Sequence, residues 1–161
     1  MKKEDRELLI KELCGRLPYG VKIALKNNGG YHHENIAKKG DVTIDELKGF
    51  SGTYFSIFHK NPNEWDWYDD DIDVEDIKPY LFPISSMTEE QRKEISKRYN
   101  LHTFYGIIEI TNHTYGCYED DNSCHLQDYL WLVDWFNKNH FDYRGLIQKG
   151  IAIDATGLNI Y

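Results

Sequence analysis

The sequence predicts an α+β fold in which an antiparallel sheet of about four to five strands is packed by an N-terminal helix and a long C-terminal helix. Two observations lead to this prediction: apolar residues recur at helical spacing near both ends of the chain, and short segments of alternating apolar residues lie between them. The chain has 161 residues, 40% of them apolar, which is enough to bury one core. We therefore expect a single domain over residues 1–161.

The first predicted elements are a short helix and three strands. Leucines recur at spacings of about four from Leu8 to Leu17, which predicts a helix over residues 4–14. Alternation from Val21 to Leu25 predicts a strand with one buried face. Two more strands are expected at about 41–47 and 53–59, with a turn at 49–52, and the short connections favour a three-stranded antiparallel meander. Residues 61–73 are predicted to form a loop.

The second half is predicted to contain two helices and two further strands. Residues 74–81 fit either a helical turn or a short strand, and Thr88-Glu-Glu-Gln91 matches a capping box that begins a helix over 89–99. A strand is expected at 104–111 and a polar loop at 116–123. The helix over 126–138 is expected to be the longest and to anchor the core, and a helical turn ending at Gly150 precedes a strand at 151–154. The predicted apolar stripe of the 126–138 helix is Leu126, Tyr129, Leu130, Val133 and Phe136.

Composition and charge narrow the functional classes. The formal net charge of −8 disfavours non-specific binding to nucleic acids and to anionic membranes. No apolar run is long enough to span a bilayer, and the first ten residues lack the pattern of a signal peptide, so we expect a cytoplasmic protein. The three cysteines do not suggest a disulfide framework, and no common phosphate-binding, dinucleotide-binding or hydrolase motif occurs. No cofactor is therefore predicted.

The most conspicuous functional feature is an acidic strip at residues 64–76, which carries eight carboxylates and no basic residue. Burying so much like charge is costly, so the strip should be solvated, paired with another basic surface or neutralised by a cation. Its aromatic rings would anchor a protein partner, and its carboxylates would steer a basic one. The candidate partner-binding residues are Trp65, Asp66, Trp67, Tyr68, Asp69, Asp70, Asp71 and Asp73.

Three other interpretations of the acidic strip stay open. It fits a solvated loop that is held in place by its aromatic residues. It also partly fits a calcium loop, because Asp69, Asp71 and Asp73 alternate, although the glycine that such a loop needs at its sixth position is missing. A third interpretation is mimicry of a nucleic-acid phosphate track.

Two other groups of residues are weaker candidates. His113, Cys117, Cys124 and His125 offer soft metal ligands, but the cysteines lack the close pairing of a zinc site. The segment from His140 to Arg144 contains His140, Asp142, Tyr143 and Arg144, which could perform acid–base chemistry on an anionic substrate. The same residues fit a junction between helices, in which Asp142 is an N-cap and Arg144 pairs with Asp142 or with the acidic strip, and this structural interpretation is favoured.

Four short segments of the sequence resemble segments of a known family. They are RLPYGV at residues 16–21, DIKPYL at 76–81, SSMTEE at 85–90 and HFDYRGLI at 140–147, the last followed by Gly150-Ile-Ala-Ile-Asp. In this order they resemble an uncharacterised family of small proteins from gut Bacteroidales and their phages or mobile elements. The resemblance implies an accessory protein that acts on host machinery. We therefore expect a non-enzymatic protein-binding module with a host protein as its partner, the alternatives being a small enzyme or ligand binder and a metal-binding structural domain.

Overall fold

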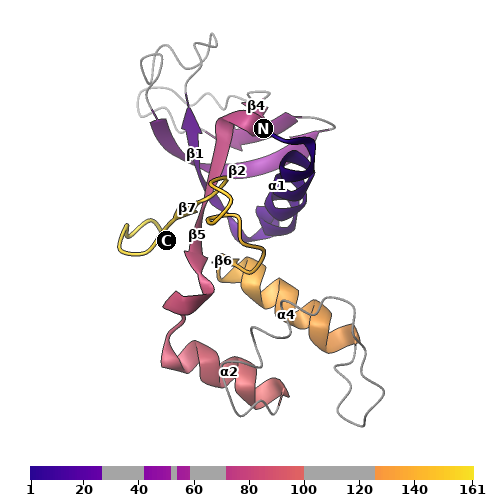
Figure 1. Ribbon diagram of the computed structural model, residues 1–161, viewed down its shortest axis with the longest axis vertical. Helices are drawn as coiled ribbons and strands as arrows, with labels where there is room; N and C mark the ends of the chain where they lie inside the picture. The colour runs from indigo at the N-terminus through magenta and orange to yellow at the C-terminus, as the bar shows by residue number, and fades with distance from the viewer. Residues whose placement is uncertain (27–41, 52–53, 59–71, 100–125) are drawn as a thin grey trace.

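The computed structural model describes residues 1–26, 42–51, 54–58, 72–99 and 126–161 (Figure 1). The predicted α+β class is confirmed: a mixed sheet packs against helix α1 (Lys3–Arg16), and helices α2 (Glu89–Tyr99) and α4 (Leu126–Lys138) lie at the opposite end of the molecule. The strands are β1 (Lys22–Lys26), β2 (Val42–Ser51), β3 (Tyr54–Phe58), β4 (Ile72–Asp73), β5 (Ile77–Pro83), β6 (Phe141–Asp142) and β7 (Ile153–Asp154). Short 3-10 helices are η1 (Leu17–Tyr19), η2 (Val74–Asp76) and η3 (Ile84–Ser86).

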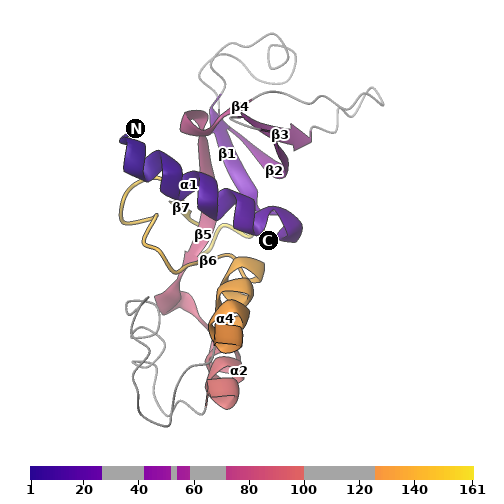
Figure 2. The ribbon, with the colours of Figure 1, turned by 90° about the vertical axis from the view of Figure 1, so that its right-hand side faces the viewer.

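Helix α1 covers one face of the sheet because its leucines fall on one side (Figure 2). Leu9 and Leu13 are fully buried and pack with Ile23 of β1 and Leu47 of β2 in the main core. Glu4 lies in the first turn and Arg16 in the last, charges that suit the two ends of the helix dipole. The helix predicted over residues 4–14 is therefore confirmed, with small extensions at both ends.

The predicted meander is also confirmed. The sheet has the order β4-β3-β2-β1-β5-β6, and β1, β2 and β3 are antiparallel neighbours. β2 is longer than predicted, because a β-bulge between Leu47 and Gly49 allows the strand to continue through residues that were expected to turn. β3 lies second from the edge of the sheet, where β4 pairs with it.

A purely antiparallel sheet of four to five strands is the wrong prediction. Among the described residues the sheet has seven strands, and β5 pairs in parallel with β6 at Phe82–Phe141 and with β7 at Tyr80–Ile153. Strands β4, β6 and β7 have two residues each, so they are too short to show a period of two in the sequence. The strand predicted at 104–111 and the loop predicted at 116–123 lie outside the described residues.

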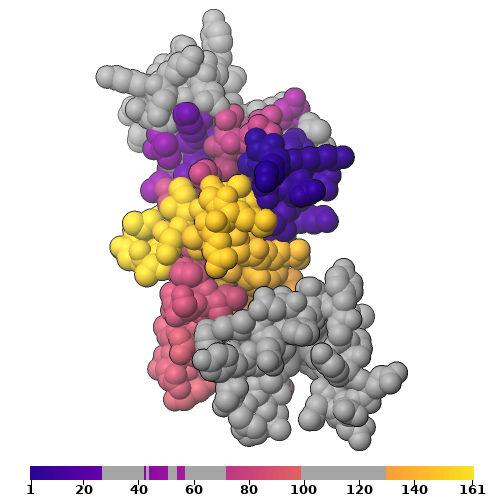
Figure 3. Space-filling model, viewed as in Figure 1, coloured from indigo at the N-terminus to yellow at the C-terminus, as the bar shows by residue number. Residues whose placement is uncertain are grey.

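The buried apolar side chains form two main clusters. One joins α1 to the sheet, and the other lies between α2, α4 and β6 and contains Met87, Ile95, Leu132, Trp135, Phe136 and Phe141. We call residues 82–99 and 126–143 the helical lobe and the other described residues the sheet unit. A smaller cluster of Ala24, Tyr80 and Ala155 lies on the face of the sheet away from α1, and the space-filling view shows the C-terminal residues between the sheet and α2 (Figure 3).

The predicted stripe of helix α4 is only partly confirmed. Phe136 of the stripe is buried, as are Leu132 and Trp135 beside it, whereas Leu130 of the stripe is 57% exposed. The ring of Trp135 stacks on Phe141 at 5.6 Å between centroids, and this aromatic contact sets the orientation of the helix. α4 also packs within the helical lobe, and α1, with 14 residues against 13, is longer than α4. In the part of the chain that the structure describes, no helix is both long and apolar enough to cross a membrane.

Candidate functional site

The described end of the acidic strip is fixed to the edge of the sheet. Ile72 and Val74 are buried in the main core, whereas the side chains of Asp73 and Glu75 are about half exposed, at 51% and 47%. Ile72 and Asp73 point to opposite faces as neighbours in strand β4, whereas Val74 and Glu75 belong to the short 3-10 helix η2. Among the candidate partner-binding residues, Asp73 is therefore on the surface at the base of the strip, while residues 65–71 lie outside the described residues.

An exposed aromatic ring lies beside Asp73. Tyr54 of β3 is the cross-strand partner of Asp73 in β4, so the two side chains emerge on the same face, and Tyr54 is 45% exposed. Asp73 also accepts a hydrogen bond from the backbone N–H of Glu75 at 3.3 Å and faces Arg6 of α1 at 3.9 Å. Both members of this ion pair are partly exposed, so the pair neutralises the carboxylate only weakly.

The metal-ligand candidates His113, Cys117, Cys124 and His125 lie outside the described residues. Within the segments that the structure does describe, no group of three or more His, Cys, Asp or Glu side chains is arranged to hold a metal ion. The remaining cysteine, Cys14, is partly buried on α1, and this burial raises the pKa of its thiol.

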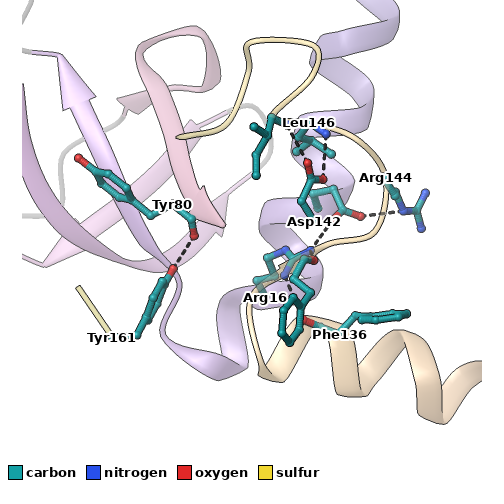
Figure 4. A network of polar contacts seen from close by, with 10 residues as sticks. Arg16, Tyr80, Phe136, Asp142, Arg144, Leu146 and Tyr161 are labelled. Atoms are coloured by element: carbon teal, nitrogen blue, oxygen red, sulfur yellow. Dashed lines mark hydrogen bonds and ion pairs between the residues drawn. The ribbon is translucent and has the colours of Figure 1, made fainter. Parts of the chain in front are cut away.

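The segment from His140 to Arg144 forms a polar junction between the sheet unit and the helical lobe (Figure 4). Both carboxylate oxygens of Asp142 accept backbone hydrogen bonds, from Leu146 and Ile147, each at 2.8 Å. The residue is buried, with 8% exposure, so these bonds replace the water that the carboxylate loses on folding. Asp142 therefore has the structural role that was favoured, but it is not the predicted N-cap of a helix, because residues 143–150 form turns and the donors are four and five positions away.

A buried ion pair from α1 completes the junction. Arg16 and Glu12 are 0% and 1% exposed, and Nη2 of Arg16 donates to Oε2 of Glu12 at 2.8 Å. Arg16 also donates to the backbone carbonyls of Phe141 at 2.8 Å and Phe136 at 3.4 Å. The other Glu12 oxygen faces Nε of Arg144 at 2.8 Å. Glu12 is thus shared by two guanidinium groups, and it is a partner of Arg144 that the sequence did not predict.

The aromatic ring of Tyr143 lies between these two guanidinium groups. The guanidinium carbon of Arg16 is 5.5 Å from the ring centroid and that of Arg144 is 5.2 Å away, both within range of a cation–π contact. Burial, and next the charge of Glu12, raise the pKa of Tyr143, so its hydroxyl stays protonated near neutral pH. The ring also stacks on Phe136 of α4 at 5.3 Å.

His140 occupies the left-handed region at the end of α4, with φ of 57°. Its imidazole stacks on the ring of Tyr161 at 3.9 Å between centroids and is buried. Burial, followed by the positive charges of Arg16 and Lys22, lowers the pKa of His140 to about 4. The imidazole is therefore neutral at physiological pH, and Nδ1 has no hydrogen-bond partner among the described residues.

Tyr161 connects two strands of the sheet at the same place. Its hydroxyl accepts from the backbone N–H of Lys22 at 3.0 Å and donates to the carbonyl of Tyr80 at 2.8 Å (Figure 4). The β1–β5 ladder ends at the pair Ile23–Pro79, so the hydroxyl bridges the next two residues of the two strands. Burial raises the pKa of Tyr161 to about 12.

The contacts of the junction are those of a structural joint. Asp142 holds backbone amides, Arg144 pairs with Glu12, Tyr143 packs between guanidinium groups, and His140 is neutral and stacked. The sequence interpretation missed Glu12 and Arg16, since oppositely charged residues four positions apart on a helix are usually solvated. Their spacing from Leu9 and Leu13 was the available signal, because positions 9, 12, 13 and 16 share one helix face.

Comparisons with known proteins add no family to this description: no family model matches the chain, and neither a curated protein nor a solved structure shows significant similarity to it.

Proposed function

We propose that this protein is a non-enzymatic protein-binding module and that the acidic strip at residues 64–76 forms its partner contact. The observation that carries the proposal is the exposed pair of Tyr54 and Asp73 at the edge of the sheet, where the strip joins the folded core. The pair combines an aromatic ring with a carboxylate, the same combination that the sequence repeats from Trp65 to Asp71.

The anchoring of the strip supports the proposal further. Because Ile72 and Val74 are buried, the C-terminal end of the strip is fixed to the edge of the sheet, so binding carries no entropy cost for ordering that end. The ion pairs of Asp73 and Glu75 are long, at 3.9 Å each, and both carboxylates are about half exposed. Such pairs leave the charge available to steer a basic partner.

The composition of the strip supports a partner with a basic surface. Eight carboxylates would raise the association rate with such a partner at low salt, and large aromatic side chains supply the buried contacts that carry most binding energy. The resemblance to small proteins of Bacteroidales and their mobile elements supports a host protein as that partner. A protein-binding module is also favoured over an enzyme by the structural contacts of the candidate acid–base residues, His140, Asp142, Tyr143 and Arg144.

Affinity capture from a Bacteroidales host extract, quantified by mass spectrometry, tests the proposal. We expect Trp65→Ala/Trp67→Ala and, separately, Asp69→Asn/Asp70→Asn/Asp71→Asn to lower the recovery of a specific host protein at least ~tenfold, as the loss of interface anchors predicts. The melting temperature should stay unchanged.

A charge-matched control removes three carboxylates elsewhere. Glu89→Gln/Glu90→Gln/Glu94→Gln changes α2, whose three glutamates are exposed, and alters the net charge by the same amount as the triple aspartate variant. This control should capture the partner as the unmodified protein does. Equal capture by the strip variants and the control would remove the basis for the proposal.

A further inference from the structure

We infer that the helical lobe is a separate cooperative unit, which detaches and unfolds while the sheet unit stays folded, and that Arg16 is the latch that holds it in place. This inference concerns the conformational behaviour of the chain and does not depend on the proposed function.

The first argument is the separation of the two cores. Among the described residues, the cluster around α1 and the sheet is separate from the lobe cluster, and the partly buried Phe82 is the side chain that packs against both the lobe cluster and the small cluster around Tyr80. The described residues of the lobe bury six apolar side chains, a core that gains too little from burial to keep α2 and α4 folded by itself. Detachment of the lobe from the sheet unit therefore entails the loss of α2 and α4.

The second argument is how the chain passes between the two units. β5 changes partners along its length: residues 77–81 pair with β1 and β7, whereas Phe82 and Pro83 pair with β6. The return crossing is at Arg144 and Gly145, and Gly145 has a φ of 73°, a conformation that glycine adopts without strain. The chain thus enters the lobe at Phe82 and leaves it after Tyr143, and strand β6 pairs with the entering residues inside the lobe. Detachment therefore breaks few backbone hydrogen bonds of the sheet.

The third argument is the polar nature of the junction. Helix α1 holds the lobe through the bonds from Arg16 to the carbonyls of Phe136 and Phe141, and Tyr19 of η1 donates a hydrogen bond to Asp134 of α4. When the lobe detaches, Glu12 and Arg16 regain their hydration, which offsets part of the lost interaction. A purely apolar junction of the same size would be harder to open.

Native-state hydrogen exchange of the full chain, followed by NMR, tests the inference with a matched pair of variants. Ile23→Val lies in the sheet unit and Ile95→Val in the helical lobe, and both isoleucines are fully buried. Each substitution should lower the relevant protection factors about threefold to tenfold, the range expected for losing one buried methyl group. Neither change is large enough to prevent folding.

The two variants should give different patterns. Ile23→Val should lower the protection of the slowest β1 and β2 amides and leave the α4 amides within twofold of the unmodified protein, because the sheet unit is folded both before and after the lobe detaches. Ile95→Val should lower the protection of the α4 amides and of the β1 and β2 amides by the same factor. The lobe is unfolded both when it detaches alone and when the whole chain unfolds. If Ile23→Val lowers the α4 amides as much as the β1 amides, the chain is one cooperative unit and the inference is wrong.

A second pair of variants tests the latch. Arg16→Lys cannot keep all the hydrogen bonds that Arg16 makes, so the protection of the α4 amides should fall at least ~tenfold. Arg6→Lys is the control, since Arg6 contacts Asp73 at the far end of α1, and the α4 amides should stay within twofold. Equal protection in the two variants would show that Arg16 is not the latch.

Discussion

Arg16 illustrates how a charged side chain is accommodated in the interior of this protein. Its guanidinium group lies against the carboxylate of Glu12, two backbone carbonyls and the ring of Tyr143. One of those carbonyls belongs to Phe136, in the last turn of α4, where the helix dipole favours a positive charge. The two Nη atoms of the buried cation thus bond to groups that would otherwise need partners of their own, while its Nε has no hydrogen-bond partner among the described residues.

His140 should make the stability of the protein depend on pH. Its pKa is about 4 in the folded protein and near 6.5 in an unfolded chain, so between these values the unfolded state binds a proton that the folded state does not. The free energy of unfolding should therefore fall as the pH is lowered from 6.5 towards 4. At pH 5 the loss from this one group is ~2 kcal/mol.

His140→Asn isolates this contribution. Asparagine tolerates the left-handed backbone of residue 140 and does not titrate. Urea unfolding at pH 7 and pH 5 should show that the variant loses ~2 kcal/mol less over this interval than the unmodified protein. Parallel losses in the two proteins would contradict the assignment.

At the scale of elements, the sequence motif at the start of helix α2 predicted the helix correctly. The capping box at Thr88 and Gln91 forms as predicted: the Thr88 amide donates to Gln91 Oε1 at 2.9 Å, and the Gln91 amide donates to Thr88 Oγ1 at 3.3 Å. Helix α2 begins at the next residue and ends at Tyr99, the predicted bounds.

The cap should contribute measurably to stability. Thr88→Ala removes the hydroxyl acceptor and should lower the free energy of unfolding by ~1 kcal/mol, measured by urea titration. Thr88→Ser keeps a hydroxyl group and is the matched control, which should differ little from the unmodified protein. An alanine variant as stable as the serine variant would mean that the cap does not support α2.

The elements that the sequence did not reveal depend on contacts between distant residues. The two-residue strands β6 and β7 form because β5 has edge positions with which they can pair. Two residues are too few to show a periodicity, so the sequence cannot predict such strands. Glu12, which pairs with Arg144, lies on the first helix of the chain, so spacing near Arg144 could not identify it. Leu130 is exposed for a similar reason, since the stacking of Trp135 on Phe141 turns α4.

At the scale of the whole molecule, polar and aromatic residues have two different uses. In the junction, Glu12 and Arg16 are buried and paired, Glu12 also pairs with the partly exposed Arg144, and Arg16 reaches across to the helical lobe. At the edge of the sheet, Asp73 and Tyr54 are exposed beside a strip of unusually high negative charge. A structural role for Asp142 was predictable from sequence, although its donors at Leu146 and Ile147 were not, and the buried role of Glu12 was not predictable because burial depends on the packing of the whole chain.

Hydroxyl-radical footprinting of the free protein, read residue by residue by mass spectrometry, is the most direct test of an outward-facing acidic strip. Trp135, which is 5% exposed, supplies an internal standard for a protected indole ring. We expect Trp65 and Trp67 to be oxidised at least ~tenfold faster than Trp135, as accessible interface anchors would be. Rates for Trp65 and Trp67 as low as that of Trp135 would show that these rings belong to the interior and would contradict the proposed partner contact.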